Sequence, residues 1–258
     1  MSERFTVLQN PHIPAGAYEP SYYLNGDGAP QGAFAFNEEL TVARAQAIAT
    51  AADVPPGGRI LDYGCGLGAF TIAYKKLGYD VVGVDPSPHA LGHVLPEARD
   101  LVQPLTQDVL TKFEANPFDL VVAKDVFEHI PKGELHDVTD RLLCIAKQIM
   151  AIIPLADENG KFLFPLYEND PTHITRMTRN EWLGFFPYSS VRDYEELTAK
   201  VRRPDKVDST LCLMLAEPSP EWQYLYDWAR LADETPARGQ RAGRFWRGIR
   251  NILVGHNS

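Results

Sequence analysis

Cysteine is scarce in this chain, and the few cysteines are poorly placed for cross-linking. The 258 residues include only Cys65, Cys144 and Cys212, which are far apart and odd in number. This usage indicates neither a disulfide framework nor a cysteine-based zinc site. It is typical of a reducing compartment, so we expect a cytoplasmic protein.

Long apolar runs are lacking as well. No stretch reaches the roughly eighteen consecutive apolar residues of a membrane-spanning helix, and the first residues lack the basic start and apolar segment of a secretory signal. We therefore expect a soluble protein. With 45% hydrophobic residues the chain can bury a full core, and its length suits one α/β domain with additions.

Positive charge is sparse outside the C-terminal end. The chain carries 25 basic and 34 acidic residues, for a net charge of −9. Residues 238–258 hold five arginines and no acid, which leaves 20 basic against 34 acidic side chains elsewhere, or −14. An acidic body of this kind repels a polyanion, so we expect no nucleic-acid partner.

The most informative segment, residues 60–70, reads Ile-Leu-Asp-Tyr-Gly-Cys-Gly-Leu-Gly-Ala-Phe. It predicts a strand, a glycine turn and the start of a helix, and a second predicted strand ends at Asp85. This order indicates a nucleoside-cofactor site. Two ligands fit at this point, because Gly64 and Gly66 with Ala69 also match the dinucleotide fingerprint.

Asp62 distinguishes the two ligands. A carboxylate two residues before the first glycine would repel a pyrophosphate but attract the ammonium and sulfonium groups of S-adenosylmethionine. With three glycines in this spacing and an acid at Asp85, residues 38–155 resemble the class I S-adenosylmethionine-dependent methyltransferases of the small-molecule or glycan type.

The resemblance implies a role for each matching residue. The three glycines lie under the cofactor, Asp62 lies near its methionine end, and Asp85 binds the ribose hydroxyls. A carboxylate suits that last role on chemical grounds, because it accepts two hydroxyl donors and repels a ribose 2′-phosphate. Alternatively, Asp85 only opens a turn. The expected cofactor-binding residues are Asp62, Gly64, Cys65, Gly66, Gly68, Asp85, Pro86, Asp108, Val109, Lys124 and Asp125.

Asp108 and Val109 follow the third predicted strand at the interval where the family places an acid against the adenine amino group. An exocyclic amine offers protons that a carboxylate accepts, and Val109 could cover the ring face. The alternative is that Asp108 is a surface acid in a turn.

The segment from Lys124 to Pro131 leaves the fourth predicted strand over the expected cofactor. It lacks the Asp/Asn-Pro-Pro-aromatic signature with which amino-methylating nucleic-acid enzymes hold a flipped base. It resembles instead the Glu-His-Ile/Val ending of small-molecule and glycan methyltransferases. Asp125 or His129 could contact the cofactor or accept a proton; alternatively, Glu128 and His129 only cap the next helix.

A second candidate site lies between Glu168 and Arg176. Asp170 could orient the His173 imidazole and raise its basicity, so that His173 removes a proton from a substrate hydroxyl. Arg176 could hold a phosphate or carboxylate of the same substrate. The alternative is an Asp-Pro turn and a helix cap in which His173 stabilises the loop. No paired spacing on one helix face supports a metal site, and we predict none.

The chain divides into three segments. Residues 1–37 form an irregular arm rich in aromatic side chains. We expect it to fold over the cofactor cleft or the substrate entrance, where Tyr22 and Tyr23 contact the substrate; the alternative is that the arm packs against the outside of the core. Residues 38–217 form the catalytic domain, and residues 218–258 form a helical extension. The last helix of that extension is amphipathic and cationic, so it could dock on an anionic membrane, a partner protein or the acidic body.

Alternating helical and strand patterns predict the fold of the catalytic domain. They indicate a doubly wound, Rossmann-like α/β fold, with a seven-stranded, mainly parallel sheet closed by an antiparallel hairpin. After the first strand, we expect strands at 80–85, 101–105, 119–124, 148–154, 190–197 and 209–216. We expect helices at 38–52, 68–78, 88–98, 132–146 and 178–186.

These patterns together predict an S-adenosylmethionine-dependent methyltransferase that acts on a small molecule or a saccharide, on oxygen, with one general base. The competing enzyme class is a nicotinamide-dependent oxidoreductase, which would bind a dinucleotide instead. A third hypothesis is a methyltransferase-like scaffold without catalysis. The acceptor, the methylated atom and the oligomeric state do not follow from the sequence.

Overall fold

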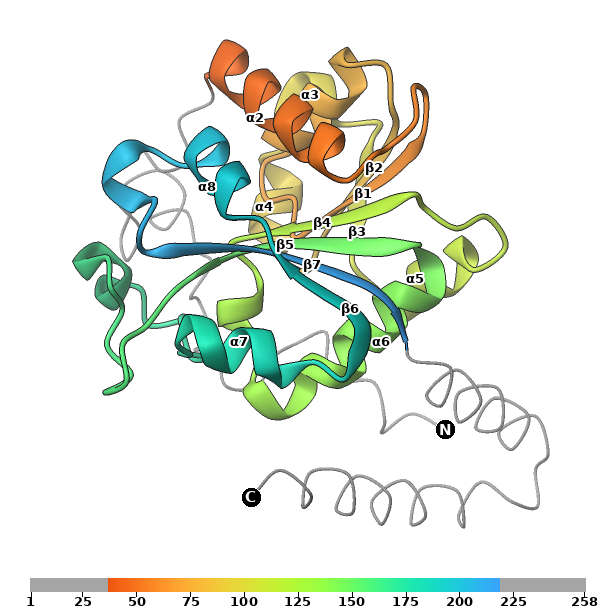
Figure 1. The fold of residues 1–258 in the computed structure, drawn as a ribbon. Helices are drawn as coiled ribbons and strands as arrows, with labels where there is room; N and C mark the ends of the chain where they lie inside the picture. The colour runs from red at the N-terminus through yellow and green to blue at the C-terminus, as the bar shows by residue number, and fades with distance from the viewer. Residues whose placement is uncertain (1–36, 219–258) are drawn as a thin grey trace, which may run out of the picture. The chain divides into compact units, whose positions relative to one another are not determined.

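The computed structural model describes residues 37–218 (Figure 1). The predictions for Tyr22 and Tyr23 and for the basic segment 238–258 lie outside the described residues. Among residues 37–218, no helix is both long and apolar enough to cross a bilayer.

A seven-stranded sheet with the order β3-β2-β1-β4-β5-β7-β6 forms the centre of the fold. Neighbouring strands from β3 to β5 pair in parallel, and β7 pairs antiparallel with β5. This arrangement confirms the predicted fold class. It also brings the carboxyl ends of five strands to one edge, where α/β proteins of this kind bind their ligands. The strands are β1 Arg59–Tyr63, β2 Asp80–Asp85, β3 Val102–Pro104, β4 Leu120–Lys124, β5 Gln148–Pro154, β6 Tyr188–Asp193 and β7 Thr210–Pro218.

Helices cover both faces of the sheet, with α2, α3 and α8 on one face and α5, α6 and α7 on the other (Figure 1). The alternating side chains of β4 explain this: Leu120 and Val122 pack into one core, and Val121 and Ala123 into the other. A strand buried on both faces needs a continuous apolar run, as this one has. The helices are α2 Glu38–Ala51, α3 Ala69–Lys76, α4 Pro88–Gly92, α5 Gln107–Phe113, α6 Leu135–Ile145, α7 Arg179–Phe185 and α8 Glu195–Val201.

Local signals account for the helix boundaries that were predicted well. The Asn37 side chain accepts a hydrogen bond from the Leu40 amide and starts α2. Thr178 and Glu181 form a capping box at the start of α7. Gly78, with a φ of +85°, follows α3 and lets the chain turn into β2.

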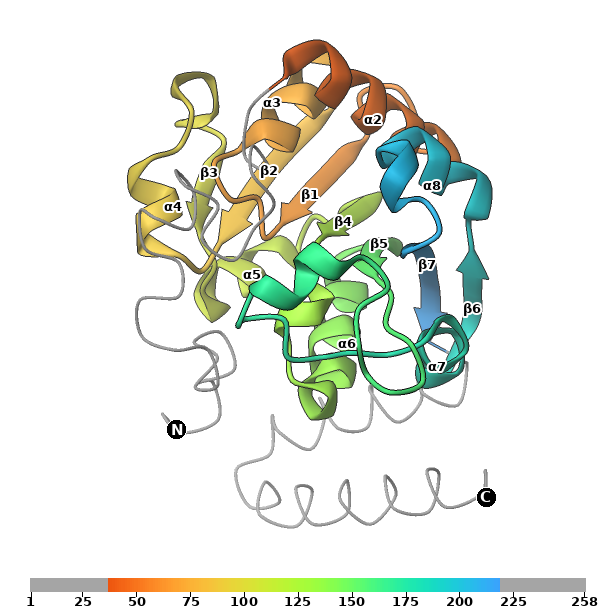
Figure 2. The same ribbon diagram turned by 90° about the vertical axis from the view of Figure 1, so that its left-hand side faces the viewer.

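Three elements differ from the predictions. The helix expected at 88–98 ends at Gly92, and a separate 3₁₀ helix spans Pro96–Ala98. The strand expected at 190–197 is wrong beyond Asp193, because β6 ends there and Glu195 begins α8. Two acids in the first turn of α8 favour a helix N-terminus, and its buried residues follow a helical spacing. The helix α5 was not predicted; the Thr106 hydroxyl caps it by accepting from the Val109 amide. The strands β6 and β7 are adjacent in the sheet, as expected. The helix α8 forms part of the connection between them (Figure 2).

Candidate active site

The turn between β1 and α3 is built from three glycines with left-handed backbones. Gly64, Gly66 and Gly68 have φ values of +75°, +55° and +86°, which side chains rarely allow. A Cβ on Gly64 would lie 2.6 Å from Val126 Cγ2, and one on Gly68 would lie 2.6 Å from Ala98 Cβ. A Cβ on Gly66 would meet no atom of the described residues within 4 Å. The turn therefore packs tightly at its two ends and leaves its middle open for a ligand.

Asp85 joins this turn to the end of β2. Its Oδ2 accepts a hydrogen bond from the Gly66 amide at 2.8 Å, and its Oδ1 accepts from the Ser87 amide at 2.8 Å. Burial raises the pKa of Asp85 above its ordinary value, and the two amide bonds partly offset that rise. Each carboxylate oxygen can accept a further hydrogen bond. Asp85 therefore fits the predicted ribose role and also orients the glycine turn; Pro86 follows it and is exposed.

Asp62 is buried at the carboxyl end of β1, where its Oδ2 accepts a hydrogen bond from the Thr71 hydroxyl at 2.7 Å. Gly83 makes room for this contact, because a Cβ there would lie 2.6 Å from Thr71 Oγ1. Burial raises the pKa of Asp62 to about 6. Burial also raises the pKa of the neighbouring Cys65 thiol, so Cys65 is neutral at pH 7. A buried carboxylate of this kind gains from a cationic ligand.

The start of α5 lies beside the end of β2, because the Leu105 amide donates to the Asp85 carbonyl at 2.9 Å. Asp108 is exposed in the first turn of α5, and Val109 is half-buried. The structure therefore places both residues near the ribose acid. Their role at the adenine stays a prediction.

Asp125, at the end of β4, is held in an ion pair that the sequence did not reveal. Arg202 Nη1 donates to Asp125 Oδ2 at 2.9 Å, its Nη2 contacts Oδ1, and Lys124 Nζ contacts Oδ2. Although burial alone would raise it, these two cations hold the pKa of Asp125 well below its usual range. Asp125 also has a φ of +56°, which is uncommon for a residue with a side chain. Cofactor contacts of Lys124 and Asp125 remain predictions.

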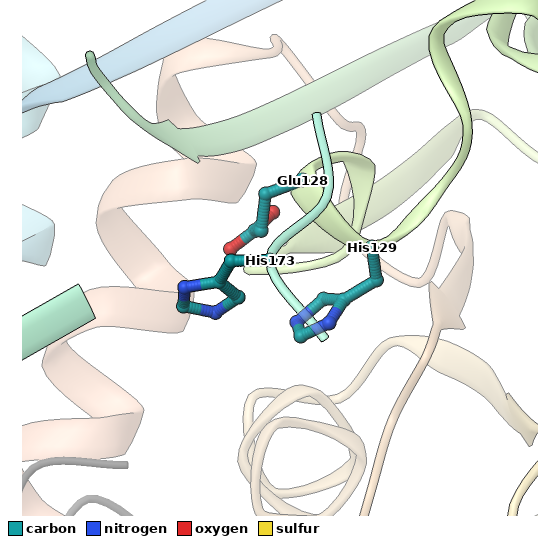
Figure 3. Close-up of side chains that lie close together, drawn as sticks. All are labelled: Glu128, His129 and His173. Carbon is teal, nitrogen blue, oxygen red and sulfur yellow. The ribbon is translucent and has the colours of Figure 1, made fainter. Parts of the chain in front are cut away.

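A second group of side chains joins the loops that follow β4 and β5 (Figure 3). Glu128 and His129 come from the 3₁₀ helix Phe127–His129, and His173 comes from the loop after β5. One ligand atom from each residue lies within 4.8 Å of the others. The Glu128 carbonyl also accepts the Ile174 and Thr175 amides, each at 2.9 Å, and so ties the two loops together.

The hydrogen bonds around His129 define its tautomer. Asp170 Oδ1 accepts from the Thr172 amide at 2.9 Å and from the Thr172 hydroxyl at 2.5 Å. Because that hydroxyl has one proton, Thr172 Oγ1 accepts from His129 Nδ1, 2.7 Å away. His129 therefore carries its proton on Nδ1 and a lone pair on Nε2. Burial and the neighbouring His173 lower the pKa of His129 to about 4, which keeps the imidazole neutral at pH 7.

The predicted pair of Asp170 and His173 is present, with 3.4 Å between Asp170 Oδ2 and His173 Nε2. The other ring nitrogen, Nδ1, lies 3.0 Å from the Tyr167 carbonyl, to which it must donate. Burial lowers the pKa of His173, although Asp170 opposes this. Both nitrogens of His173 thus face oxygen atoms of the protein itself. Its role as the general base stays a prediction.

Glu128 is fully buried, and neither of its carboxyl oxygens has a hydrogen-bond partner among residues 37–218. Burial, followed by the charge of Asp125, raises the pKa of Glu128 well above its ordinary value. With two imidazoles, Glu128 supplies the ligand types that a divalent cation accepts. The set spans two loops, so no spacing within one helix could indicate it.

Arg176, predicted to bind a substrate anion, is engaged within its own loop. Its Nη1 donates to Glu168 Oε2 at 2.7 Å and to the Gly160 carbonyl at 3.2 Å. Its guanidinium carbon lies 4.8 Å from the Phe162 ring centroid. These contacts give Arg176 a structural use, and its substrate role stays a prediction.

Comparison with known proteins places these features in a family. Residues 36–199, more than half of the chain, match a family described as "Methyltransferase domain". The ubiquinone biosynthesis O-methyltransferase of Rhodopseudomonas palustris is 35% identical over 77 residues, which are 29% of this chain and 30% of that protein. The protein of the same name from Caulobacter vibrioides is 30% identical over 122 residues, 45% of this chain and 46% of that protein. The chain thus spans less than half the length of either relative.

A solved structure from Nostoc punctiforme, provisionally named an O-methyltransferase, covers 69% of this chain and 57% of its own. It is 13% identical with a TM-score of 0.51, a likeness that concerns the fold alone.

The residues at the carboxyl ends of β1 and β2 fit S-adenosylmethionine. The open middle of the turn at Gly66 admits a ligand, Asp85 offers acceptors for ribose hydroxyls, and Asp62 offers a buried charge for the cationic end. The family match decides between the two nucleoside ligands that the glycine spacing allowed. This chain belongs to the methyltransferase domain family, and its residues at this edge of the sheet fit S-adenosylmethionine as the cofactor.

Proposed function

We propose that this enzyme methylates an oxygen atom of a small molecule or a saccharide, and that His129 is the general base that takes the acceptor's proton. The observation that carries the proposal is the chain of hydrogen bonds from Asp170 through Thr172 to His129. It orients the imidazole at the carboxyl end of β4 and leaves the lone pair on Nε2. This assignment replaces His173, which was the first candidate on sequence grounds.

Methyl transfer to a hydroxyl requires alignment of the acceptor oxygen with the methyl group of the cofactor and removal of one proton. The cofactor supplies an activated methyl group, so the protein's contribution is largely the positioning of the acceptor oxygen. A hydroxyl acceptor also loses its proton, and a base within hydrogen-bond reach typically accelerates that step by about 10²- to 10⁴-fold. The buried acid Asp170 stabilises the positive charge that His129 acquires when it accepts the proton.

His173 acts as a positioning residue in this arrangement. Its ring packs edge-on against the ring of His129, with 4.7 Å between centroids and an interplanar angle of 66°. The bond from His173 Nδ1 to the Tyr167 carbonyl fixes the ring from the other side. His173 therefore restrains His129 and, through its own partial charge, helps to keep it unprotonated before the acceptor binds.

The low basicity of His129 bears on the acceptor. An imidazole whose pKa is about 4 accepts a proton most readily from a hydroxyl that is itself acidic. This favours a phenolic or similarly acidic small molecule over a saccharide alcohol. The names of the two bacterial relatives support oxygen as the methylated atom, although the shared segment covers only part of each chain.

The decisive experiment compares His129→Ala with His173→Ala, using radiolabelled S-adenosylmethionine and a panel of phenols, catechols and sugars. We expect His129→Ala to lower kcat by about 100-fold or more while cofactor affinity changes little. His93→Ala is the control, because His93 is exposed and lies outside the cluster. Normal turnover in His129→Ala would reject the base, and no transfer by the native enzyme to any oxygen acceptor would reject O-methylation.

We place the enzyme in the cytoplasm and expect its partner to be the small-molecule acceptor rather than nucleic acid. A further contact through the basic segment 238–258 with a membrane or a protein stays part of this proposal. Sedimentation with anionic liposomes, with and without that segment, tests it. Equal pelleting of the two forms would reject a membrane contact.

A further inference from the structure

We propose that the methyl acceptor also carries an oxyanion, either a phosphate or a carboxylate, which binds a cluster of four cations beside the histidines. This cation cluster consists of Arg44, Lys124, Arg202 and Lys206. The inference rests on the proposed function, since it names the chemical class of the acceptor that the same site takes.

The cation cluster is assembled at the ligand-binding edge of the sheet from three parts of the chain. Lys124 ends β4, Arg202 directly follows α8, and Lys206 ends the 3₁₀ helix Pro204–Lys206. Arg44 comes from α2, which packs beside α8 on the same face of the sheet (Figure 1). The chain then enters β7 at Thr210, whose register partner is the last residue of β5. The cations therefore lie at the same edge as the loops that carry the histidines.

The positive charge of the cation cluster exceeds the negative charge in contact with it. Asp125 is the carboxylate that Arg202 and Lys124 both contact. Burial raises the pKa of the nearby Glu128 and so favours its neutral form, and Asp62 lies within electrostatic reach of Lys124. The nearby Arg203 and Asp205 are exposed and pair with each other at 2.7 Å. Among the described residues, the carboxylate in direct contact with the cation cluster is that of Asp125, so an excess of positive charge is left for a ligand with one or two negative charges.

The cations act on one another as expected for an excess of positive charge. Burial and then Arg202 lower the pKa of both Arg44 and Lys124. Burial, Arg202 and further neighbouring cations lower the pKa of Lys206 to about 8, although Asp125 opposes this. Like charges held together in this way are relieved by a bound anion.

Two buried donors in the cation cluster have no acceptor within the described residues. The Nε atoms of Arg44 and Arg202 are both buried without a hydrogen-bond partner. Arg202 as a whole is only 8% exposed, so water does not readily replace the missing acceptor. Buried N–H donors are normally paired, and an oxyanion provides several acceptors at once.

Tyr167 connects the cation cluster to the proposed base. Lys206 Nζ lies 4.6 Å from the ring centroids of Tyr167 and Phe164, and 3.4 Å from the Tyr167 hydroxyl. The carbonyl of the same tyrosine accepts from His173, which packs against His129. One acceptor molecule can therefore place its hydroxyl at the histidines and its oxyanion at Lys206, with the rings of Tyr167 and Phe164 lying between the two groups.

The carboxylate of the cofactor itself is the competing anion, so the test occupies that position first. The full-length enzyme is saturated with S-adenosylhomocysteine, and calorimetry then measures binding of inorganic phosphate and of acetate. We compare the native enzyme with Lys206→Gln, with Lys206→Arg, which keeps the charge, and with Lys132→Gln. Lys132 is the matched control, since its ammonium lies near the ring of Phe185, away from the cation cluster.

We expect phosphate or acetate to bind the native enzyme, Lys206→Arg and Lys132→Gln alike, and to bind Lys206→Gln about tenfold more weakly. Affinity for S-adenosylhomocysteine should agree within about twofold in all four proteins, because the cofactor is held by other residues. The tighter of the two anions identifies the oxyanion class. Absence of binding to the native enzyme, or equal binding to Lys206→Gln, would overturn the proposal.

Kinetic measurements on the same proteins distinguish a failure of this inference from a failure of the proposed function. Matched acceptors with and without the oxyanion should differ in KM for the native enzyme, and Lys206→Gln should abolish that difference. If anions bind at Lys206 but no oxygen acceptor is methylated, the anion site stands and O-methylation fails. If methylation proceeds with equal KM for both kinds of acceptor, the anion site fails alone.

Discussion

Arg202 and Asp125 form a bidentate ion pair that connects the end of α8 to the loop after β4. The two residues are far apart in the sequence, and the pair links the closing strands of the sheet to its ligand-binding edge. It also accounts for the unusual backbone of Asp125, because a two-pronged partner holds the carboxylate in place while its φ stays at +56°.

Removal of the guanidinium should destabilise the fold. Arg202→Met leaves Asp125 without its main partner, and we expect the free energy of unfolding to fall by about 2 kcal/mol; a fully buried pair costs more, but the Asp125 side chain is 30% exposed. Arg203→Met is the matched control: its pair with Asp205 is exposed and should contribute little. Urea unfolding of the three proteins decides, and equal midpoints would contradict the role of Arg202.

Two glycines of the cofactor turn should respond differently to alanine. A methyl group on Gly68 collides with Ala98, so Gly68→Ala should lower the free energy of unfolding by about 2 kcal/mol or more. Gly66→Ala has open space and should cost only about 1 kcal/mol for its left-handed backbone, yet it should weaken cofactor binding at least tenfold. Thermal unfolding and calorimetry separate the two effects; reversed outcomes would mean that the open side of Gly66 does not face the cofactor.

Cofactor affinity should depend on pH through Asp62. The pKa of Asp62 in the free protein is about 6, so the carboxylate that attracts the sulfonium is largely protonated at pH 5 and ionised at pH 7. We expect affinity for S-adenosylmethionine to rise about tenfold over that interval. Asp62→Asn, which can still accept from Thr71, should remove the dependence. A pH profile that is the same in both proteins would contradict the assignment of Asp62 to the cationic end.

The same shift predicts how stability changes with pH in the absence of cofactor. The folded protein holds the proton of Asp62 more tightly than the unfolded chain, whose carboxyl has an ordinary pKa. The contribution of Asp62 to the free energy of unfolding is therefore full at the lowest pH and is lost as pH rises from about 4 to about 6. The difference in stability between the native protein and Asp62→Asn, followed across that window, checks the sign.

Glu128 provides a test of metal dependence. Burial raises the pKa of Glu128 and so favours the neutral carboxyl, which glutamine resembles in shape; we therefore expect Glu128→Gln to keep kcat within about twofold. For the same reason a chelator should leave turnover unchanged. Loss of activity in chelator that returns with added Mn²⁺ or Zn²⁺, together with an inactive Glu128→Gln, would identify Glu128, His129 and His173 as metal ligands instead.

Features carried by neighbouring residues could be predicted from the sequence. The glycine turn, the acid at Asp85, the capping box at Thr178 and the apolar run of β4 each follow from local chemistry, and the structure contains all four. The short helix α5 was not predicted, because its main signal in the sequence is a single threonine cap at its start. Residues 190–197 contain both a strand and the start of a helix, and only packing against the sheet separates them.

Features that depend on distant residues could not be predicted. Arg202 gave no signal in the sequence, because its importance comes from Asp125 on another loop. The choice between His129 and His173 rested on Thr172, whose hydroxyl orients one ring and not the other. The orphan carboxyl of Glu128 becomes evident only when both loops close over it.

A single peptide carbonyl, that of Glu128, receives the amides of both Ile174 and Thr175. The loops after β4 and β5 are therefore structurally coupled as one unit, although more than forty residues of chain separate them. Redesign of the acceptor preference must accordingly treat the two loops as a pair, since a change that reshapes one displaces the other. The glycine turn packs against the first of these loops where Gly64 meets Val126, so a redesign that leaves the cofactor turn as it is must keep Val126 in place.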